Sequence, residues 1–174
     1  MLMRIAAIDK VNDLYDRNCQ LQGAPFAAAL LRDIGVDYLI GNPERLEALP
    51  EGAFITVSNH PYGHIDGIML IDLMGHIRED FKVMVNQLLA YIRAMSPNFI
   101  EVVPKGEEDS SAPSAANIGG VRETLGHLRG GHPVGFFPAG AVSDLSLKER
   151  RIRDREWQIP VLRIIQKAKV PVIP

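Results

Sequence analysis

The chain has 174 residues, of which 47% are apolar and 23% are charged, and this balance is typical of a single globular domain. Its formal net charge of −2 excludes a strongly basic protein, so the composition gives no electrostatic reason to expect nucleic acid as a partner. The single cysteine, Cys19, excludes an internal disulfide framework and favours a reducing, cytoplasmic compartment.

The sequence predicts neither a membrane-spanning helix nor a secretory signal. Its longest uncharged run, residues 18–31, is about 14 residues long and contains both glycine and proline, whereas a span needs roughly 20 apolar residues. The N-terminus carries Arg4, Asp9 and Lys10 without the apolar core and cleavage site of a signal peptide. We therefore expect no segment of this sequence to cross a membrane.

The predicted elements begin with helices. Apolar residues recur at helical spacing over residues 5–15, and residues 25–33 form a second helical segment that stops at Gly35. Short apolar or alternating runs then predict six strands, over residues 36–40, 53–57, 81–85, 99–103, 133–137 and 170–173. Helical patterns lie between these runs, over residues 66–78, 87–95, 117–129 and 154–168.

This alternation of strand and helix predicts an α/β fold with a mostly parallel central sheet, flanked by helices and preceded by N-terminal helices. We expect a helical segment at residues 1–35 and an α/β domain at residues 36–174. Residues 105–114 are polar and turn-rich and predict a surface loop. Because the chain ends at Pro174, directly after a run that should be buried in the sheet, we expect the domain to be truncated at its C-terminus.

The segment around His60 is the main candidate for a functional site. The predicted strand at residues 53–57 leads toward His60, Pro61 and Gly63 prevent a regular helix there, and Asp66 falls near the first turn of the next helix. In open parallel sheets, ligands bind at the carboxyl ends of the strands. We therefore expect His60 and Asp66 to fold back toward each other at such an edge.

A histidine paired with a carboxylate can act as a general base. The carboxylate binds one imidazole nitrogen, fixes the tautomer and stabilises the imidazolium, which leaves the other nitrogen to remove a proton from a hydroxyl. The sequence near His60 shows no serine or cysteine with a supporting nucleophile motif, and Ser58 is expected to project opposite His60 if the strand continues. The attacking hydroxyl is therefore expected to belong to the substrate.

Two other interpretations of these residues stay open. Asp66 at a strand-to-helix turn can simply cap the helix by accepting its first N–H groups. Alternatively, His60, His64 and Asp66 can be read as zinc or iron ligands in a metal-dependent hydrolase. Pro61 and Gly63 argue against the metal interpretation, because they interrupt the helical face that would bring both histidines to one ion.

The stretch VSNHPYGHIDG, residues 57–67, resembles the first signature block of the glycerolipid acyltransferases, the group that contains the lysophosphatidic acid acyltransferases. Five residues separate His60 from Asp66. This spacing resembles a bacterial branch that includes ornithine-lipid and other lyso-lipid O-acyltransferases and haemolysin-like proteins. Segments similar to the family's later blocks follow in the same order, at residues 81–89, 99–106, 131–143 and 170–174, so that the resemblance covers residues 36–174.

The resemblance implies transfer of a fatty acyl group from a thioester, on acyl carrier protein or coenzyme A, to a hydroxyl of a lyso-lipid. It implies His60 as the general base and Asp66 as its orienting partner, with no metal and no cofactor beyond the acyl donor. Backbone N–H groups near Gly63 or Gly140 are the expected donors to the oxyanion of acyl transfer. A non-catalytic lipid-binding fragment stays open as an alternative.

Further candidate substrate-binding residues come from the same blocks. Asn59 is expected to brace the first-block loop, next to Gly63. Phe137, Pro138 and Gly140 are expected to shape a turn in the third block, directly after a strand. The resemblance thus implies a site built from both loops.

The third block departs from the form F-P-E-G-T-R-S that is common in the family. Ala139, Ala141 and Val142 stand in place of the glutamate, threonine and arginine. Because groups of this kind hold a phosphate-bearing acceptor in the family, an acceptor anchored by a phosphomonoester is not expected. Alternative sites for an anionic head group are Lys105, Arg122 and the basic run at residues 148–155, although such a run is usually a solvated face.

A lyso-lipid substrate also implies peripheral contact with a membrane, at the inner face of the cell membrane for a cytoplasmic protein. The N-terminal helices, residues 1–17 and 25–33, could supply this contact through their apolar faces, with basic residues at head-group level. The alternative is that they pack against the sheet, and we favour packing.

Overall fold

The computed structural model describes residues 2–86, 89, 91–102 and 115–174. The loop predicted at residues 105–114 lies outside the described residues, as do residues 87–88 and 90 of the helix predicted at 87–95.

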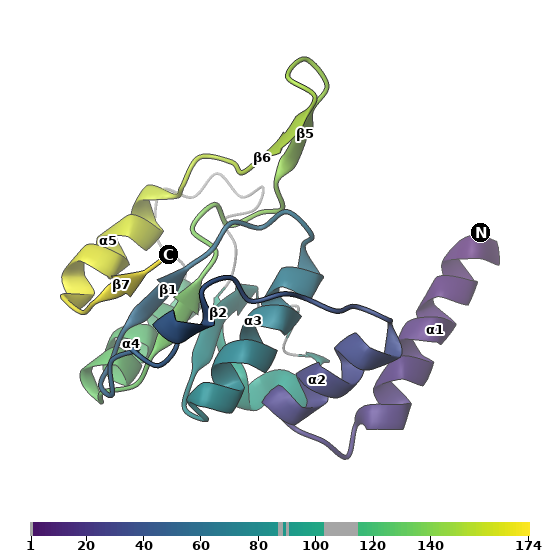
Figure 1. Cartoon of the computed structure of the whole chain (residues 1–174), viewed down its shortest axis with the longest axis horizontal. Coiled ribbons are helices and arrows are strands. Elements are labelled where there is room, and N and C mark those ends of the chain that lie inside the picture. The colour runs from purple at the N-terminus through teal and green to yellow at the C-terminus, as the bar shows by residue number, and fades with distance from the viewer. Residues whose placement is uncertain (1, 87–88, 90, 103–114) are drawn as a thin grey trace.

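Figure 1 shows the helices and strands along the chain. The α-helices are α1 (Leu2–Asn18), α2 (Ala24–Asp33), α3 (His64–Ile77), α4 (Ala115–Arg129) and α5 (Ile159–Ala168), with short 3-10 helices at η1 (Pro43–Arg45) and η3 (Arg93–Asn98). The strands are β1 (Ile55–Val57), β2 (Lys82–Asn86), β3 (Phe99–Val102), β4 (Val134–Phe136), β5 (Asp144–Ser146), β6 (Arg151–Arg153) and β7 (Val172–Ile173).

The central sheet confirms the α/β prediction. Its strands lie in the order β3-β2-β4-β1-β7, and every neighbouring pair is parallel. The strands correspond to five of the predicted runs. β1 and β4 are neighbours with Val57 opposite Phe136, so both strands end at the same edge of the sheet. The loops that follow these two strands are therefore brought together, although they are far apart in the sequence.

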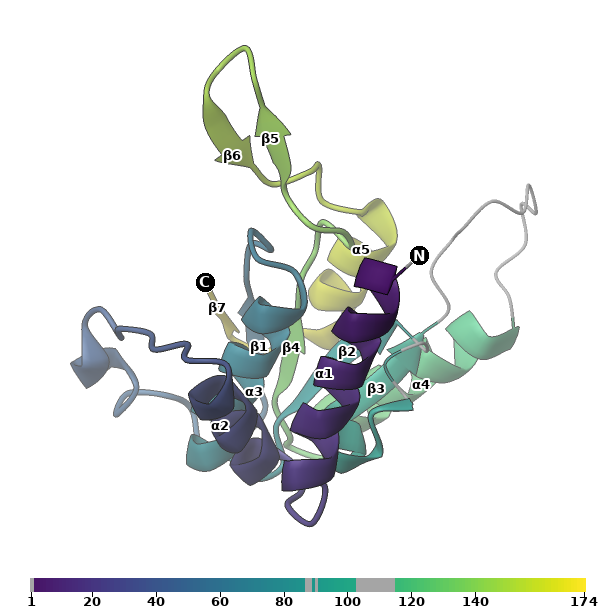
Figure 2. The same ribbon diagram turned by 90° about the vertical axis from the view of Figure 1, so that its right-hand side faces the viewer.

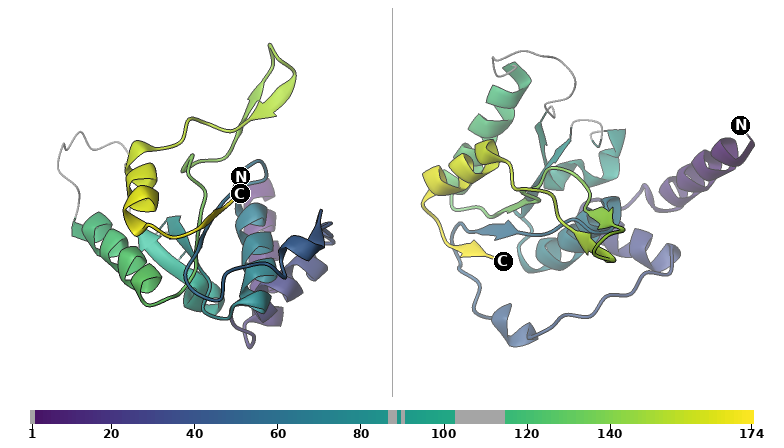
Figure 3. Two further views of the ribbon diagram at one scale, coloured as in Figure 1. Left: turned by 60° about the vertical axis from the view of Figure 1, so that its left-hand side comes forward. Right: turned by 90° about the horizontal axis from the view of Figure 1, so that it is seen from above.

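Helices cover both faces of this sheet (Figure 3). α2 and α3 pack on one face, in a cluster that includes Phe54 and Phe81. α4 and α5 pack on the other face, in a cluster that includes Ile55 and Val134. Phe54 and Ile55 are adjacent and both fully buried, because successive side chains of an extended segment point to opposite faces. Burial on both faces explains why the neighbouring strands β1 and β4 are buried at every position and carry no charged residue.

The second N-terminal helix packs into this core, as we expected. Phe26 and Leu31 of α2 are buried, and the ring of Tyr15 on α1 meets Phe26 edge-on at a centroid distance of 5.7 Å. α2 also lies close to α3. The absence of a side chain at Gly75 allows this approach, since a Cβ added there would lie only 2.8 Å from Cβ of Ala24. The apolar face of α2 is therefore not available to a bilayer. Among the helices that the structure describes, none is long and apolar enough to cross a membrane.

The prediction of a strand at residues 36–40 is wrong. This segment is irregular, and Leu39 is fully exposed. The hydroxyl of Tyr38 donates a hydrogen bond to Oδ2 of Asp72 on α3, at 2.6 Å. The segment thus runs beside a helix and not beside a strand, and an alternating pattern without a neighbouring strand does not form a ladder.

Two predicted helices also differ from the structure. The helix predicted over residues 154–168 begins only at Ile159, because Asp154 binds the backbone of His60 and Gln158 binds the turn after β4. Residues 151–153, just before it, pair with residues 144–146 in an antiparallel hairpin that the sequence did not predict. Of the residues described in the helix predicted at 87–95, residues 89, 91 and 93–95 have 3-10 geometry and Ile92 is irregular; residues 93–95 belong to η3, which contains Pro97. Proline has no N–H to donate, which favours a short helical turn over a regular α-helix.

Arg78 fastens several loops at the amino edge of the sheet, opposite to the edge where the strands end. Its guanidinium donates to the carbonyls of Glu51 and Gly131 and, at 2.8 Å, to Oδ2 of Asp80. Nδ1 of His132 lies 2.7 Å from the same oxygen. Burial raises the pKa of Asp80, but the hydrogen bonds from Arg78 and His132 outweigh burial, so the pKa lies below its ordinary value of 3.8.

Replacing Asp80 by asparagine is expected to lower the free energy of unfolding by about 1–2 kcal/mol near neutral pH, because the charge-assisted bonds to Arg78 and His132 are lost. The folded-state pKa is lowered, so this stabilisation is fully present above the pKa of the unfolded chain. It disappears as the pH falls through the folded-state pKa. Urea unfolding of Asp80→Asn and wild type should therefore differ at neutral pH and converge in acid.

The exposed Asp9 on α1 provides a matched control, and Asp9→Asn is expected to unfold like the wild type. Equal stability of Asp80→Asn and wild type at neutral pH would contradict the role assigned to this carboxylate.

Candidate active site

The loop after β1 positions His60 at the carboxyl edge of the sheet. Directly after β1, Ser58 still donates its N–H to the carbonyl of Phe136 on β4, at 3.0 Å. Gly63 has a φ of 66°, which glycine adopts without steric cost, and this residue turns the chain from the strand into α3. A Cβ at Gly63 would also lie 3.3 Å from Cγ2 of Val142. Backbone geometry and space therefore both favour glycine here.

His60 and Asp66 are in contact, as their spacing predicted. Nδ1 of His60 lies 3.0 Å from Oδ2 of Asp66, and the two side chains are only 19% and 9% exposed. The same oxygen accepts the backbone N–H of Tyr62, at 2.8 Å. Tyr62 precedes α3, and Gly63, the residue before the helix, has no side-chain cap. Asp66 thus binds the loop before α3 and the imidazole of His60. The capping interpretation had it accept the first N–H groups of the helix instead.

The hydrogen bond to Asp66 determines how the imidazole of His60 is used. A carboxylate only accepts hydrogen bonds, so the ring proton is assigned to Nδ1, and Nε2 is left as an acceptor. The ring of Phe137 lies against the imidazole, with centroids 4.3 Å apart and planes inclined by 30°. A Cβ at Gly67 would lie 4.0 Å from Cε2 of Phe137, in ordinary contact. The imidazole is therefore held by a carboxylate at one atom and by an aromatic ring at its face.

A second carboxylate, Asp154, holds the backbone of His60, and sequence reasoning missed it. Its Oδ1 accepts the N–H of His60 at 3.2 Å and the hydroxyl of Ser143 at 2.8 Å. Ser143 in turn donates its N–H to the carbonyl of His60, at 2.9 Å. Oδ2 of Asp154 is buried and has no partner among the described residues. The sequence predicted that Asp154 would start a helix. Asp154 follows His60 by 94 residues in the sequence, so no local spacing indicated their contact.

The turn after β4 is braced by Gln158. Gln158 donates its N–H to the carbonyl of Pro138 at 2.9 Å, and its side-chain amide donates to the carbonyl of Ala139 at 3.3 Å. Gly140 has a φ of 67°, and a Cβ there would collide with the Gln158 amide. The N–H of Gly140 donates to the carbonyl of Phe137 at 2.9 Å. That N–H closes the turn and is therefore not free to donate to an oxyanion.

The remaining sequence-predicted residues lie around this cluster or away from it. Asn59 is exposed beside His60, and His64 is exposed as the first residue of α3. Arg122 is exposed on α4, which covers the face of the sheet opposite to α3. Within the part of the chain that the structure describes, no three His, Cys, Asp or Glu side chains are grouped to hold a metal ion. The metal interpretation therefore has no ligand set among those residues.

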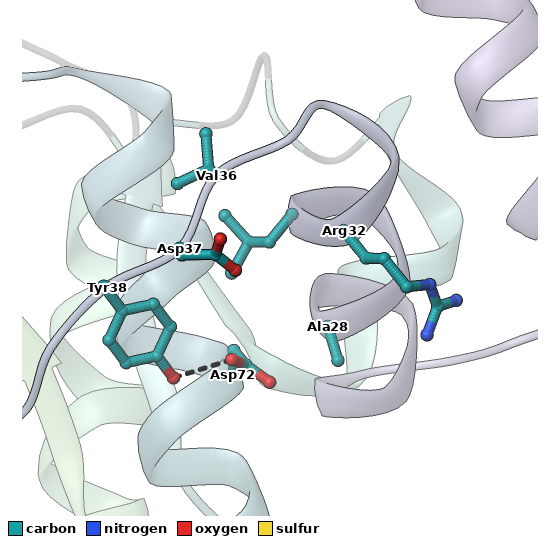
Figure 4. Close-up of a pocket in the computed structure, with 7 residues that line it drawn as sticks. Ala28, Arg32, Val36, Asp37, Tyr38 and Asp72 are labelled. Carbon is teal, nitrogen blue, oxygen red and sulfur yellow. Dashed lines mark hydrogen bonds between the residues drawn. The ribbon is translucent and has the colours of Figure 1, made fainter.

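A separate pocket of about 210 Å³ lies beside α2 and α3 (Figure 4). Its lining includes Arg32 on α2, residues 36–38 and Asp72 on α3. Burial, and then the hydrogen bond and charge of Asp72, raise the pKa of Tyr38 in this pocket. None of the sequence-predicted site residues lines it, so we assign this pocket no part in the candidate active site.

The fold and the site define a class of protein, namely an α/β protein with a histidine and an aspartate paired at the carboxyl edge of a parallel sheet. Comparison with known proteins narrows this class. Residues 1–174 match the family described as Acyltransferase, and the chain belongs to that family. The match includes the N-terminal helices as well as residues 36–174, over which the sequence motifs showed the resemblance.

Two curated relatives are both lyso-glycine lipid O-acyltransferases. The protein from Bacteroides thetaiotaomicron is 26% identical over 174 residues, which cover 99% of this chain and 60% of the relative. The protein from Phocaeicola vulgatus is 31% identical over 136 residues, which cover 72% of this chain and 45% of the relative. This chain thus spans about half the length of the relatives that it matches.

Proposed function

We propose that this protein is an O-acyltransferase that moves a fatty acyl group from a thioester to the hydroxyl of a lyso-lipid. The observation that carries the proposal is the largely buried His60–Asp66 pair at the carboxyl edge of the sheet. Membership of an acyltransferase family supports it, as do the names of two relatives that act on a lyso-lipid.

In the proposed reaction, His60 is the general base. Nε2 takes the proton of the acceptor hydroxyl while the hydroxyl oxygen forms a bond to the thioester carbonyl carbon. Asp66 stabilises the imidazolium that results. The carbon–sulfur bond then breaks, the carbonyl re-forms, and the imidazolium returns its proton to the leaving thiolate. The products are an ester and a free thiol, and His60 is neutral again.

The intermediate of this reaction carries a negative charge on the former carbonyl oxygen, and fixed donors stabilise such an oxyanion. We propose that these donors are backbone N–H groups of the loop around Gly63. This assignment is supported by position, because the loop adjoins His60 and is held in one conformation by the bond from Tyr62 to Asp66.

The proposed acceptor is a lyso-aminolipid or a lysophospholipid without a phosphomonoester head group. Ala139, Ala141 and Val142 carry no charge and no hydroxyl, so these positions of the turn after β4 cannot pair with a phosphate. The names of the relatives point in the same direction, since their acceptor is a lyso-glycine lipid. The proposed donor is a thioester of acyl carrier protein or of coenzyme A.

A water-soluble donor and a membrane-embedded acceptor meet at a membrane surface. We therefore propose a cytoplasmic protein that binds peripherally to the inner face of the cell membrane. Fractionation of cells should then recover the protein with membranes and release it at high salt.

Acyl transfer is tested directly with purified protein and labelled acyl groups. Acyl carrier protein and acyl-coenzyme A donors are each incubated with a panel that includes lyso-glycine lipid, lyso-ornithine lipid, lysophosphatidylcholine and lysophosphatidic acid. Mass spectrometry is expected to detect an ester product with an aminolipid acceptor, and the same reactions with His60→Ala set the background. A folded wild-type protein that acylates no member of the panel with either donor would contradict the proposal.

Replacing Asp154 by alanine is expected to lower kcat for acyl transfer by about 10- to 100-fold, because the His60 backbone loses one of its two fixed contacts and the imidazole shifts. Asp154→Asn keeps an oxygen acceptor and should recover part of the rate. KM is expected to change little, since Asp154 acts through His60 and does not touch the substrate. A purely structural role would instead lower the melting temperature and leave the kcat of the folded fraction unchanged.

A further inference from the structure

We propose that the hairpin formed by β5 and β6, residues 144–153, binds this protein to the surface of an anionic lipid bilayer. The hairpin stands out from the body of the protein (Figures 1 and 2). Every residue of β6 is exposed, as are two of the three in β5. The inference rests on the proposed function in one respect, since a lyso-lipid acceptor would lie in such a surface.

The strand register gives the hairpin two chemically different faces. Its paired residues are Asp144 with Arg153, Leu145 with Ile152, and Ser146 with Arg151. Paired residues share a face and successive residues alternate between faces. Leu145 and Ile152 therefore lie on one face, and the polar and charged pairs lie on the other.

The apolar face is exposed to an unusual degree. Leu145 is 63% exposed, Ile152 is 53% exposed, and Leu147, near the tip, is 82% exposed. Val142, two residues before β5, is also exposed, as is Tyr62 in the loop that adjoins Val142 through Gly63. Burial of aliphatic side chains in lipid removes apolar surface from water, and aromatic side chains favour the head-group region. This face therefore suits a bilayer better than water.

The charged residues add an attraction to anionic lipids. Five basic residues lie in or directly after the hairpin, at Lys148, Arg150, Arg151, Arg153 and Arg155. The exposed acidic residues there are Asp144 and Glu149, which pair with Arg155 and with Arg151 and Arg153. Within residues 144–153, the four basic residues and the two acidic ones leave a net charge of +2. A basic segment with exposed aliphatic side chains is the composition that binds anionic membrane surfaces.

The hairpin is attached directly to the candidate active site. Ser143, before β5, donates its N–H to the carbonyl of His60, and Asp154, after β6, accepts the N–H of His60. Both ends of the hairpin are thus fastened to the residue proposed as the general base. A hairpin bound to the bilayer would hold His60 close to the layer in which the acceptor lies.

One observation favours the hairpin over α2 as the membrane contact, and another favours a bilayer over a protein as the partner of the hairpin. The apolar face of α2 is buried in the core, so this N-terminal helix cannot supply the membrane contact. An acidic carrier protein would pair with the basic residues but would leave Leu145, Leu147 and Ile152 exposed to water. A bilayer can bury Leu145, Leu147 and Ile152 while the long basic side chains extend to the anionic head groups.

Co-sedimentation with vesicles tests the inference without any need for catalysis. Vesicles of phosphatidylglycerol and of phosphatidylcholine are mixed with wild type, with the triple variant Leu145→Ser, Leu147→Ser, Ile152→Ser, and with the double variant Lys148→Glu, Arg150→Glu. The wild type is expected to bind the anionic vesicles, and each hairpin variant to bind them at least about tenfold more weakly. Leu39→Ser and Arg129→Glu, at exposed positions outside the hairpin, are matched controls and should bind like the wild type.

Several results would overturn the inference. These are wild-type binding to phosphatidylcholine as strong as to phosphatidylglycerol, no binding to either vesicle, and hairpin variants that bind like the wild type. Binding of the basic residues to an acidic carrier protein, without binding to vesicles, would overturn it as well.

The outcome is separate from that of the proposed function. His60→Ala is expected to bind vesicles like the wild type although it transfers no acyl group. Hairpin-dependent binding by a protein without acyl transfer would overturn the proposed function alone, and acyl transfer by a protein that ignores vesicles would overturn this inference alone.

Discussion

Replacing His60 by alanine is expected to lower kcat for acyl transfer by about a thousandfold, with the fold preserved. The substitution removes Nε2, the atom proposed to take the proton of the acceptor hydroxyl. It leaves Asp66 with its bond from Tyr62, so the loop keeps part of its support. Initial rates of ester formation measure the loss, and thermal unfolding checks that the protein remains folded.

His64→Ala is the matched control, because His64 is a histidine of the same segment with an exposed side chain. It is expected to keep the wild-type rate. If His60→Ala were as active as the wild type, the assignment of the general base would be wrong. If His64→Ala were as inactive as His60→Ala, and activity required added zinc or iron, the metal-dependent interpretation would return.

Replacing Asp66 by asparagine is expected to lower kcat by at least about a hundredfold with little change in KM. The asparagine oxygen can still accept the N–H of Tyr62, so the loop is expected to survive. The amide carries no charge to stabilise the imidazolium of His60.

Asp72→Asn provides the control for this substitution, because Asp72 lies on the same helix and binds Tyr38 outside the candidate active site. It is expected to leave acyl transfer unchanged. A rate for Asp66→Asn within a few-fold of the wild type would show that the carboxylate is not needed to orient His60. The pair would then be a structural contact only.

The elements that the sequence predicted correctly depend on neighbours along the chain. The apolar run at residues 53–57 predicted a strand, and the structure forms β1 there. Pro61 and Gly63 marked the turn into α3, and the spacing of His60 and Asp66 anticipated their contact. The family resemblance of the same residues is confirmed by the match over residues 1–174.

The predictions that failed depend on partners distant in the sequence. Residues 36–40 alternate like a strand, but the strand beside them is missing and Tyr38 binds α3 instead. Residues 154–158 have helical spacing, but Asp154 and Gln158 are drawn to His60 and to the turn after β4. Tertiary contacts override local propensity in such segments, because a short element gains little free energy from propensity alone.

The amino-acid sequence by itself thus determined the α/β class, the strands of the sheet and the His60–Asp66 pair, because periodicity and short spacing act between residues close in the chain. Only the tertiary structure decided which distant groups complete the site. The parallel pairing of β1 and β4 brings Phe137 against the imidazole of His60. The hairpin of β5 and β6 brings Asp154 next to the backbone N–H of His60. Such contacts depend on strand order and loop closure, which no local pattern encodes.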